Sequence, residues 1–134
     1  MRPALRVVAA VCRNHVMIHK IFKCTGLTIP LPGKYQIEIW WCPKGAVIPS
    51  HVHMNVSSFI WMVAGRMKWR VNNQEREVRG PVRLRKSNHH PALSAYKVEP
   101  RMKHGATVTG LFGLFINLEK WTGPKTSAAT DIAY

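Results

Sequence analysis

Acidic residues are scarce in this 134-residue chain, which has six Asp and Glu against twenty Lys and Arg and a net charge of +14. The first acidic residue is Glu38. A basic excess of this size attracts polyanions of every kind, so nucleic acid is a candidate partner beside small anionic molecules. Charge alone does not choose between them.

Long apolar runs are also lacking. No run approaches the roughly 20 residues that a membrane span requires, so we expect no membrane partner. Ser is absent from the first 49 residues, and Arg6 interrupts the apolar N-terminal stretch. We therefore expect a cytoplasmic protein. An N-terminal transit peptide is the minor alternative, since Arg2, Arg6 and Arg13 share one face of a helical wheel.

Cysteine is present only as Cys12, Cys24 and Cys42, and no two of these have the C-x-x-C spacing. The odd count argues against a disulfide framework and against a zinc ribbon, and it favours a reducing compartment. We expect Cys42 to be a free, buried side chain that packs as a small hydrophobe.

Convincing helical periodicity is absent as well. Short β segments separated by Pro and Gly follow one another at about ten-residue spacing, which predicts a sandwich or closed barrel in one domain. The N-terminal extension and first strands should span 1–33, the barrel 34–121 and a loose tail 122–134. The clearest expected strands are 35–42, 48–53, 59–64, 66–71 and 107–118.

His51 and His53 lie two residues apart on an expected strand, so their imidazoles point to the same face. Two neutral imidazoles converging in a dry interior begin a site for a divalent metal. Taken alone, the pair is equally compatible with two histidines on a solvated strand.

The surroundings of the pair resemble the first motif of the cupin family. Gly45, His51, His53 and Gly65 stand at that motif's spacing, with an apolar strand before the final Gly. Ser58 departs from the motif, because it occupies the position of a Glu that supplies a carboxylate ligand. The resemblance implies a cupin-type double-stranded β-helix, also called a jelly-roll barrel.

The resemblance also implies a third histidine on a later strand. His90 is the expected third ligand and His89 the alternative, although the Pro and Gly of that second motif are missing. The segment around the histidine pair resembles cupin dioxygenases that act on acetylacetone or dihydroxyacetophenones and hold Fe(II) with three His. The matching positions are Val56, and Gly65 followed by Arg66. The implied metal is Fe(II), with Zn, Mn and Ni as alternatives.

A site of three neutral histidines leaves a divalent ion with its full +2 charge. Such an ion favours an anionic bidentate oxygen ligand, such as an enolised diketone or hydroxyketone. Ser58, Ile60 and Met62 should line a small pocket beside it. The leading hypothesis is a dioxygenase-like oxidoreductase for a small substrate. A cupin-fold binding protein without catalytic activity is the alternative.

Basic residues alternate with apolar ones on two further segments, which indicates either a solvated barrel face or a phosphate-binding surface for nucleic acid. These basic residues are Arg66, Lys68, Arg70, Arg83 and Arg85. Between them, the solvated face is the simpler interpretation.

Three remaining features complete the expectations. Phe59, Trp61 and Val63 face away from the pocket and need apolar cover, which favours a homodimer. Glu38 should form a salt bridge at an edge or interface, with an inward carboxylate as the alternative. His104 is expected in a loop and only secondarily as a fourth ligand.

Overall fold

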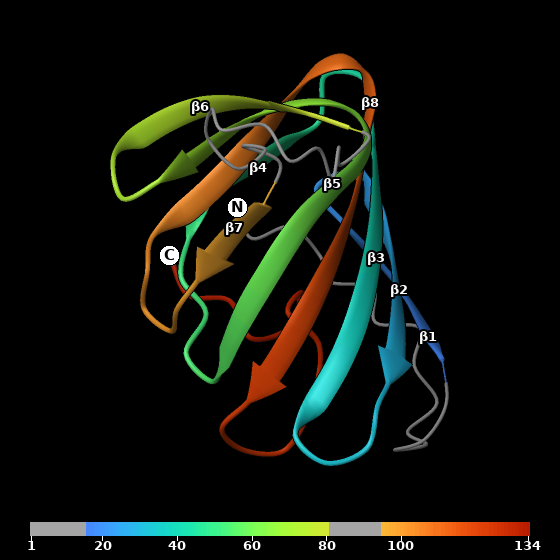
Figure 1. Cartoon of the computed structure of the whole chain (residues 1–134), viewed down its shortest axis with the longest axis vertical. Coiled ribbons are helices and arrows are strands. Elements are labelled where there is room, and N and C mark those ends of the chain that lie inside the picture. The colour runs from blue at the N-terminus through green and yellow to red at the C-terminus, as the bar shows by residue number, and fades with distance from the viewer. Residues whose placement is uncertain (1–15, 81–94) are drawn as a thin grey trace, which may run out of the picture.

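The computed structural model describes residues 16–80 and 95–134 (Figure 1). These residues form eight β-strands with connecting turns and contain no helix. The strands are β1 (Met17–Ile21), β2 (Cys24–Pro30), β3 (Tyr35–Pro43), β4 (Val47–His51), β5 (Val56–Val71), β6 (Gln74–Arg79), β7 (Ala95–Val98) and β8 (His104–Trp121). The all-β class is confirmed. Within the described ranges no helix is long and apolar enough to cross a membrane.

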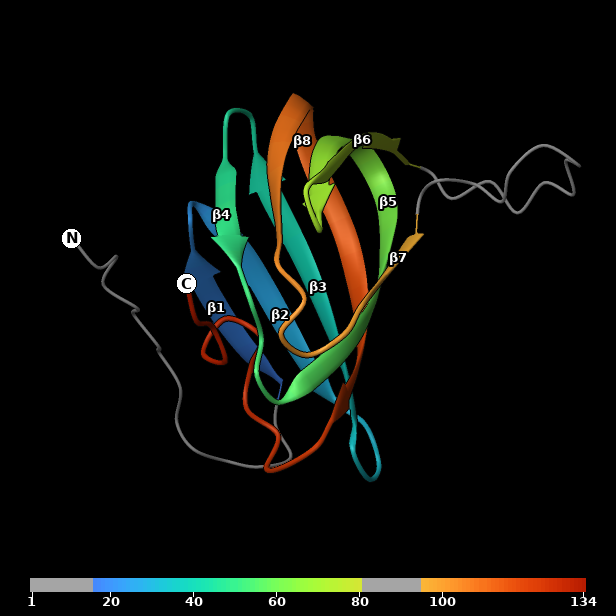
Figure 2. The same ribbon diagram turned by 90° about the vertical axis from the view of Figure 1, so that its left-hand side faces the viewer.

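The two long strands β5 and β8 organise the fold. The strand order is β1-β2-β3-β8-β5-β6, with β4 also paired to β8 and β7 to β5. The second half of β8 pairs with β3 and with the first half of β5, whereas its first half pairs with β4 and with the second half of β5. Each long strand therefore belongs to both sides of the molecule, and the strands curve around a shared interior (Figure 2).

A bend lies in the middle of β5, where its pairing with β8 shifts register between Met62 and Ala64 and again between Gly65 and Met67. Gly65 has a φ of 81°, and a Cβ there would collide with the main-chain oxygen of Phe112. The sequence predicts two strands with a turn at Gly65. The structure has one bent strand instead, because β8 stays paired with it on both sides of the bend.

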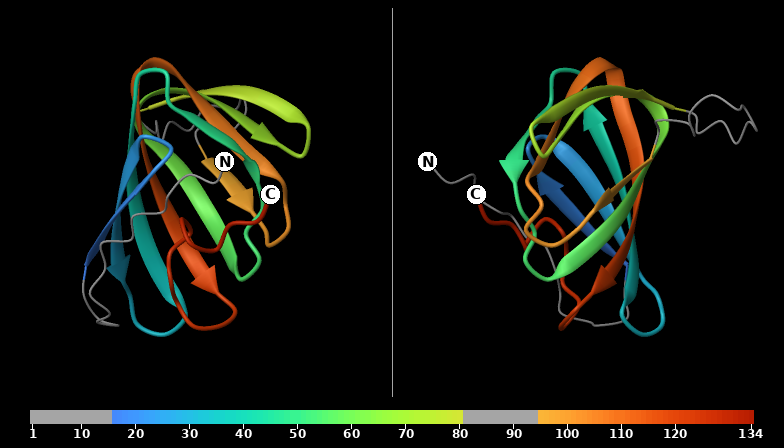
Figure 3. Two further views of the ribbon diagram at one scale, coloured as in Figure 1. Left: turned by 180° about the vertical axis from the view of Figure 1, so that it is seen from behind. Right: turned by 60° about the vertical axis from the view of Figure 1, so that its left-hand side comes forward.

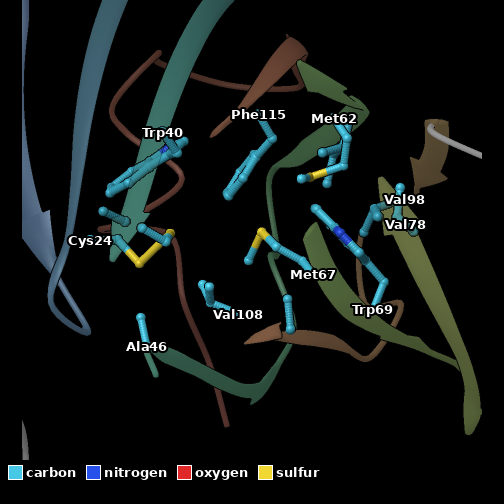
Figure 4. Packing of buried hydrophobic residues seen from close by; sticks show 14 residues of the cluster. Cys24, Trp40, Ala46, Met62, Met67, Trp69, Val78, Val98, Val108 and Phe115 are labelled. Atoms are coloured by element: carbon cyan, nitrogen blue, oxygen red, sulfur yellow. A yellow bond between two sulfur atoms is a disulfide. The ribbon is translucent and has the colours of Figure 1, made fainter. Parts of the chain in front are cut away.

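Large apolar side chains fill the interior between the strands. Trp40, Met62, Met67, Trp69 and Phe115 are all buried and point into the same space (Figure 4). Buried residues alternate along β5, and the alternation changes from even to odd numbers across the bend. The register shift thus keeps the apolar side of both halves facing inward.

A disulfide joins Cys24 on β2 to Cys42 on β3. The two strands pair in antiparallel register through the neighbouring residues Thr25 and Trp41, and the two cysteine Cα atoms lie 4.3 Å apart. The prediction that Cys42 is free is therefore wrong. An odd cysteine count does not exclude one pair, so it gives no information about the compartment. Cys12 lies outside the described residues.

The chain after β8 returns to the barrel (Figure 3). We call residues 125–133 the C-terminal strap. Lys125 donates to the carbonyl oxygens of Leu31 and Tyr35, and Val52 and Ala133 exchange two main-chain hydrogen bonds of 2.8 and 2.9 Å. The sequence predicts a loose tail here, but Ser127 and Thr130 form a closely hydrogen-bonded turn.

A candidate three-histidine metal centre

Three histidines from different parts of the chain meet at the end of the paired strands β4 and β8. His51 is the last residue of β4 and pairs directly with His104, the first residue of β8. His53 follows two residues later, where the strap pairs with Val52. All three side chains are buried.

Each imidazole is held by a hydrogen bond from Nδ1 to a main-chain carbonyl oxygen. His51 donates to Pro49 at 2.6 Å, His53 donates to Asp131 at 2.7 Å, and His104 donates to Met102 at 2.9 Å. A carbonyl oxygen only accepts, so Nδ1 carries the hydrogen in each ring. The Nε2 atom of each neutral imidazole is then left with a free lone pair.

These lone pairs converge. The Nε2 atoms of His51 and His53 lie 3.2 Å apart, and the potential ligand atoms of all three histidines lie within 4.8 Å of one another. Two facing lone pairs repel unless a cation or a shared proton lies between them. Among the described residues this is the one group of three or more His, Cys, Asp or Glu side chains that could hold a metal ion.

Protonation of the histidines does not relieve this repulsion, because their surroundings disfavour the charged form. Burial is the largest cause that lowers the pKa of His51 to about 4 and that of His104 to about 3; the neighbouring histidines contribute to both shifts, and the main-chain hydrogen bonds of Pro49 and Met102 oppose them. Burial also lowers the pKa of His53, although the carbonyl and carboxylate of Asp131 oppose the shift. At neutral pH the three rings are therefore uncharged, which is the form that binds metals.

A cavity of about 70 Å³ lies against the cluster. Its walls are mainly apolar and aromatic, and the strap contributes one side of them. The lining residues that matter below are Trp40, Ser58, Ile60, Trp69, Phe115, Asn117, Ala128 and Ala129.

Polar side chains in that wall are few. Ser58 and Asn117 are both buried, and the side-chain oxygen of Asn117 has no hydrogen-bond partner among the described residues. Ser58 and Ile60, two of the three residues expected to line a pocket, are in the wall of this cavity. Met62 does not line the cavity. Its side chain is fully buried in the apolar core, two residues beyond Ile60 on β5.

The third histidine of the cluster is His104, which the sequence placed in a loop. The predicted strand began at 107, whereas β8 begins at His104. The inward alternation of His104, Ala106 and Val108 was the signal that could have found it. His89 and His90, the predicted third ligands, lie outside the described residues.

Glu38 is fully buried and points inward from β3, so the expected edge salt bridge is wrong. One carboxylate oxygen accepts from Trp40 Nε1 at 2.8 Å. The other accepts from Ser127 Oγ at 3.2 Å and from the main-chain N–H of Ala128 at 2.8 Å. Glu38 is thus a partner of the strap and is not one of the three clustered ligands.

The basic residues of β5 have local partners. Register places Glu77 opposite Lys68 and Glu75 opposite Arg70. The guanidinium of Arg66 lies 3.8 Å from Glu77, and Arg70 donates to Thr107 and to the carbonyl of Ile48. Glu75 and Glu77 offset only part of the charge, because Arg66 also faces Arg79 in the same register. Arg83 and Arg85 lie outside the described residues.

Solved structures with the same fold support the resemblance seen in the sequence. An RmlC-like cupin from Shewanella frigidimarina matches with a TM-score of 0.64 and 18% identity, over 84% of this chain and 86% of its own. KdgF from a Halomonas species matches with a TM-score of 0.61 and 16% identity, over 78% and 82%.

A predicted oxalate decarboxylase from Thermotoga maritima matches with a TM-score of 0.58 and 11% identity, over 84% of this chain and 99% of its own. The chain therefore has the cupin fold, a double-stranded β-helix. Scans against protein-family models and curated proteins found no match.

Proposed function

We propose that this protein binds a divalent metal ion through His51, His53 and His104 and uses it to bind a small oxygen-containing ligand. The observation that supports the proposal is the arrangement of hydrogen bonds at the three imidazoles. Each Nδ1–H is donated to a carbonyl, so each Nε2 is directed toward the others without a proton. Such fixed tautomers are characteristic of metal-ligating histidines.

The chain's own residues define the ligand that fits. The cavity is small and its walls, including Trp69 and Phe115, are mainly apolar. Three neutral ligands leave the charge of the ion uncompensated, so an anionic or enolisable diketone or hydroxyketone is the favoured class. Ser58 and Asn117 would orient such a ligand through hydrogen bonds. When bound, the ion would act as a Lewis acid with positions open to ligand and O2.

Within this class we propose a dioxygenase reaction, in which O2 cleaves a carbon–carbon bond of the substrate and both oxygen atoms enter the products. Fe(II) is the proposed metal, with Zn, Mn and Ni as alternatives. A cupin-fold protein that binds the ligand without reaction is the competing function. The second experiment below, with acetylacetone under O2, distinguishes this function from the dioxygenase.

The first experiment is elemental analysis of protein purified without chelator or metal-affinity resin. We expect about one equivalent of a divalent metal, and its loss in His53→Ala but not in His19→Asn, a control at a buried histidine outside the cluster. Absence of stoichiometric metal in the unmodified protein, even after dialysis against Fe(II) or Zn, would refute the proposal.

The second experiment adds acetylacetone to the Fe(II)-loaded protein under O2. Consumption of O2 supports the dioxygenase. Binding of acetylacetone that changes the visible spectrum without O2 uptake identifies the non-catalytic alternative.

We also propose a homodimer formed by the outer face of the sheet. Two rows of apolar side chains cross β2, β3, β8 and β5: Leu27, Ile39, Ile116 and Trp61 form one, and Ile29, Ile37, Leu118 and Phe59 the other. Phe59 is 40% exposed and Leu118 is 36% exposed. A face of this kind pairs with its own copy about a two-fold axis.

Sedimentation tests the dimer. Phe59→Lys should give a monomer, and the matched control Leu111→Lys, at a 77% exposed residue outside the two rows, should not. A monomeric unmodified protein would exclude this interface.

A further inference from the structure

The C-terminal strap connects two groups that are distant in sequence, the buried carboxylate of Glu38 and the imidazole of His53. At one end Glu38 Oε1 accepts hydrogen bonds from Ser127 and from the N–H of Ala128. Three residues further on, the carbonyl of Asp131 accepts from His53 Nδ1 at 2.7 Å. The strap therefore links β3 to a clustered histidine through a short, continuous segment.

Internal hydrogen bonds make this segment a defined turn. Asp131 and Thr130 both donate their main-chain N–H to the carbonyl of Ser127, at 3.0 and 2.9 Å, and Ala129 donates to Ser127 Oγ at 3.1 Å. A shift of Ser127 is thus transmitted to the carbonyl of Asp131. The side chain of Asp131 adds a second attachment, since it accepts from Met54 and Asn55 at the far side of His53.

Glu38 and Glu119 form a buried pair in which the two carboxyl groups have different roles. Both are fully buried. Glu38 accepts from three donors, an environment suited to an ionised carboxylate. Burial, and then the charge of Glu38, raise the pKa of Glu119 well above its ordinary value. The raised pKa favours the protonated form of Glu119, and Glu119 accepts hydrogen bonds from Gln36 and Trp121.

We infer that Glu38 is a positioning residue for the metal centre: through the strap it fixes the carbonyl of Asp131 and hence the ring orientation and tautomer of His53. The inference rests on the proposed function for its meaning, because a fixed tautomer matters only if Nε2 binds a metal. Glu38 thus contributes to the site without being a ligand. Loss of such an outer partner weakens metal affinity by about 10- to 100-fold in other proteins.

The test compares Glu38→Met with the matched control Glu119→Met, which makes the same near-isosteric change at the other member of the pair. Both remove a buried carboxyl group, but only the first removes the acceptor of the strap. The first readout is the tautomer of His53 in metal-free protein, measured by long-range ¹H–¹⁵N NMR of the imidazole. We expect Nδ1–H alone in the unmodified protein and in Glu119→Met, and a mixture of tautomers in Glu38→Met.

The second readout is Zn affinity by competition with a chromophoric chelator. We expect it to fall about 10- to 100-fold in Glu38→Met and less than about threefold in Glu119→Met. Ser127→Ala, which removes one of the two strap donors to Glu38, should shift both readouts in the same direction and keeps the test decisive if Glu38→Met does not fold.

Two results would overturn the inference: an unchanged His53 tautomer in Glu38→Met and Ser127→Ala, or equal effects at Glu38 and Glu119. Failure of the proposed function is distinguishable, because it appears as absent metal binding in the unmodified protein. The tautomer measurement needs no metal.

Discussion

Two clusters of buried polar side chains share the interior of the barrel, the three histidines beside the cavity and the Glu38–Glu119 pair under the strap. In the histidine cluster every donor is used, and the remaining acceptors point at one another. In the carboxylate pair, Glu38 accepts hydrogen bonds from three donors. Both clusters are removed from solvent, so burial alone does not separate them.

Both clusters leave polar capacity over, because Glu119 Oε2 also has no hydrogen-bond partner among the described residues. What separates them is that the unpaired acceptors of the histidines converge beside a cavity. Buried acceptors without donors cost free energy, so they persist where something else binds them. The histidines have unpaired acceptors and adjoin a cavity. Both carboxylate oxygens of Glu38, in contrast, accept hydrogen bonds from Trp40 and from the strap. The comparison therefore assigns binding to the first cluster and support to the second.

Removing a histidine should produce the largest effect. His104→Ala is expected to lower metal affinity by more than about 100-fold, beyond what loss of an outer partner costs. His90→Ala is the counterpart, because the sequence resemblance favours His90 as the third ligand. We expect it to leave chelator-competition affinity within about threefold. The reverse result would transfer the third ligand to His90 and remove His104 from the centre.

The second-largest effect should be a loss of folding stability in acid, caused by the buried histidines. The pKa of His51 is near 4 in the folded protein against 6.5 when exposed, so between these values the unfolded chain binds a proton that the folded chain does not. Stability therefore falls as pH decreases from about 6.5, and His51 alone accounts for about 3 kcal/mol by pH 4. Urea unfolding of metal-free protein measures this loss. His51→Gln should reduce it, and an equal loss in that variant would contradict the assignment.

The carboxylate pair should respond to pH with the opposite sign. The pKa of Glu119 is raised, so the folded chain keeps a proton that the unfolded chain loses above about 4.5. Stability attributable to Glu119 therefore falls as pH increases. Glu119→Gln removes that loss and should be more stable than the unmodified protein at pH 8, by about 1.4 kcal/mol for each unit of pKa elevation. Below pH 4.5 the two should converge; destabilisation at both pH values would mean that Glu119 is ionised.

Sequence reasoning succeeded where a local pattern carried the information. There, sequence reasoning led from the spacing around His51 and His53 to the cupin fold. It was wrong where pairing between distant segments decides the outcome. Cys24 meets Cys42 only because β2 pairs with β3, and His104 meets His51 only because β8 pairs with β4. No motif in the sequence joins these residues, although the alternation of His104, Ala106 and Val108 does indicate that His104 points inward.

Asn117 lies between the two clusters and should give the smallest effect. It pairs with Glu38 across β3 and β8, lines the cavity, and has a side-chain oxygen that no described residue contacts by a hydrogen bond. If that oxygen serves a ligand, the empty protein is destabilised by it. Asn117→Leu, a change of similar size, should therefore raise the stability of ligand-free protein by about 1 kcal/mol while weakening acetylacetone binding to the metal-loaded form. A thermal melt measures the first effect and a spectral titration the second. Loss of stability in the variant would instead place Asn117 with the supporting cluster, as a side chain whose partner is structural.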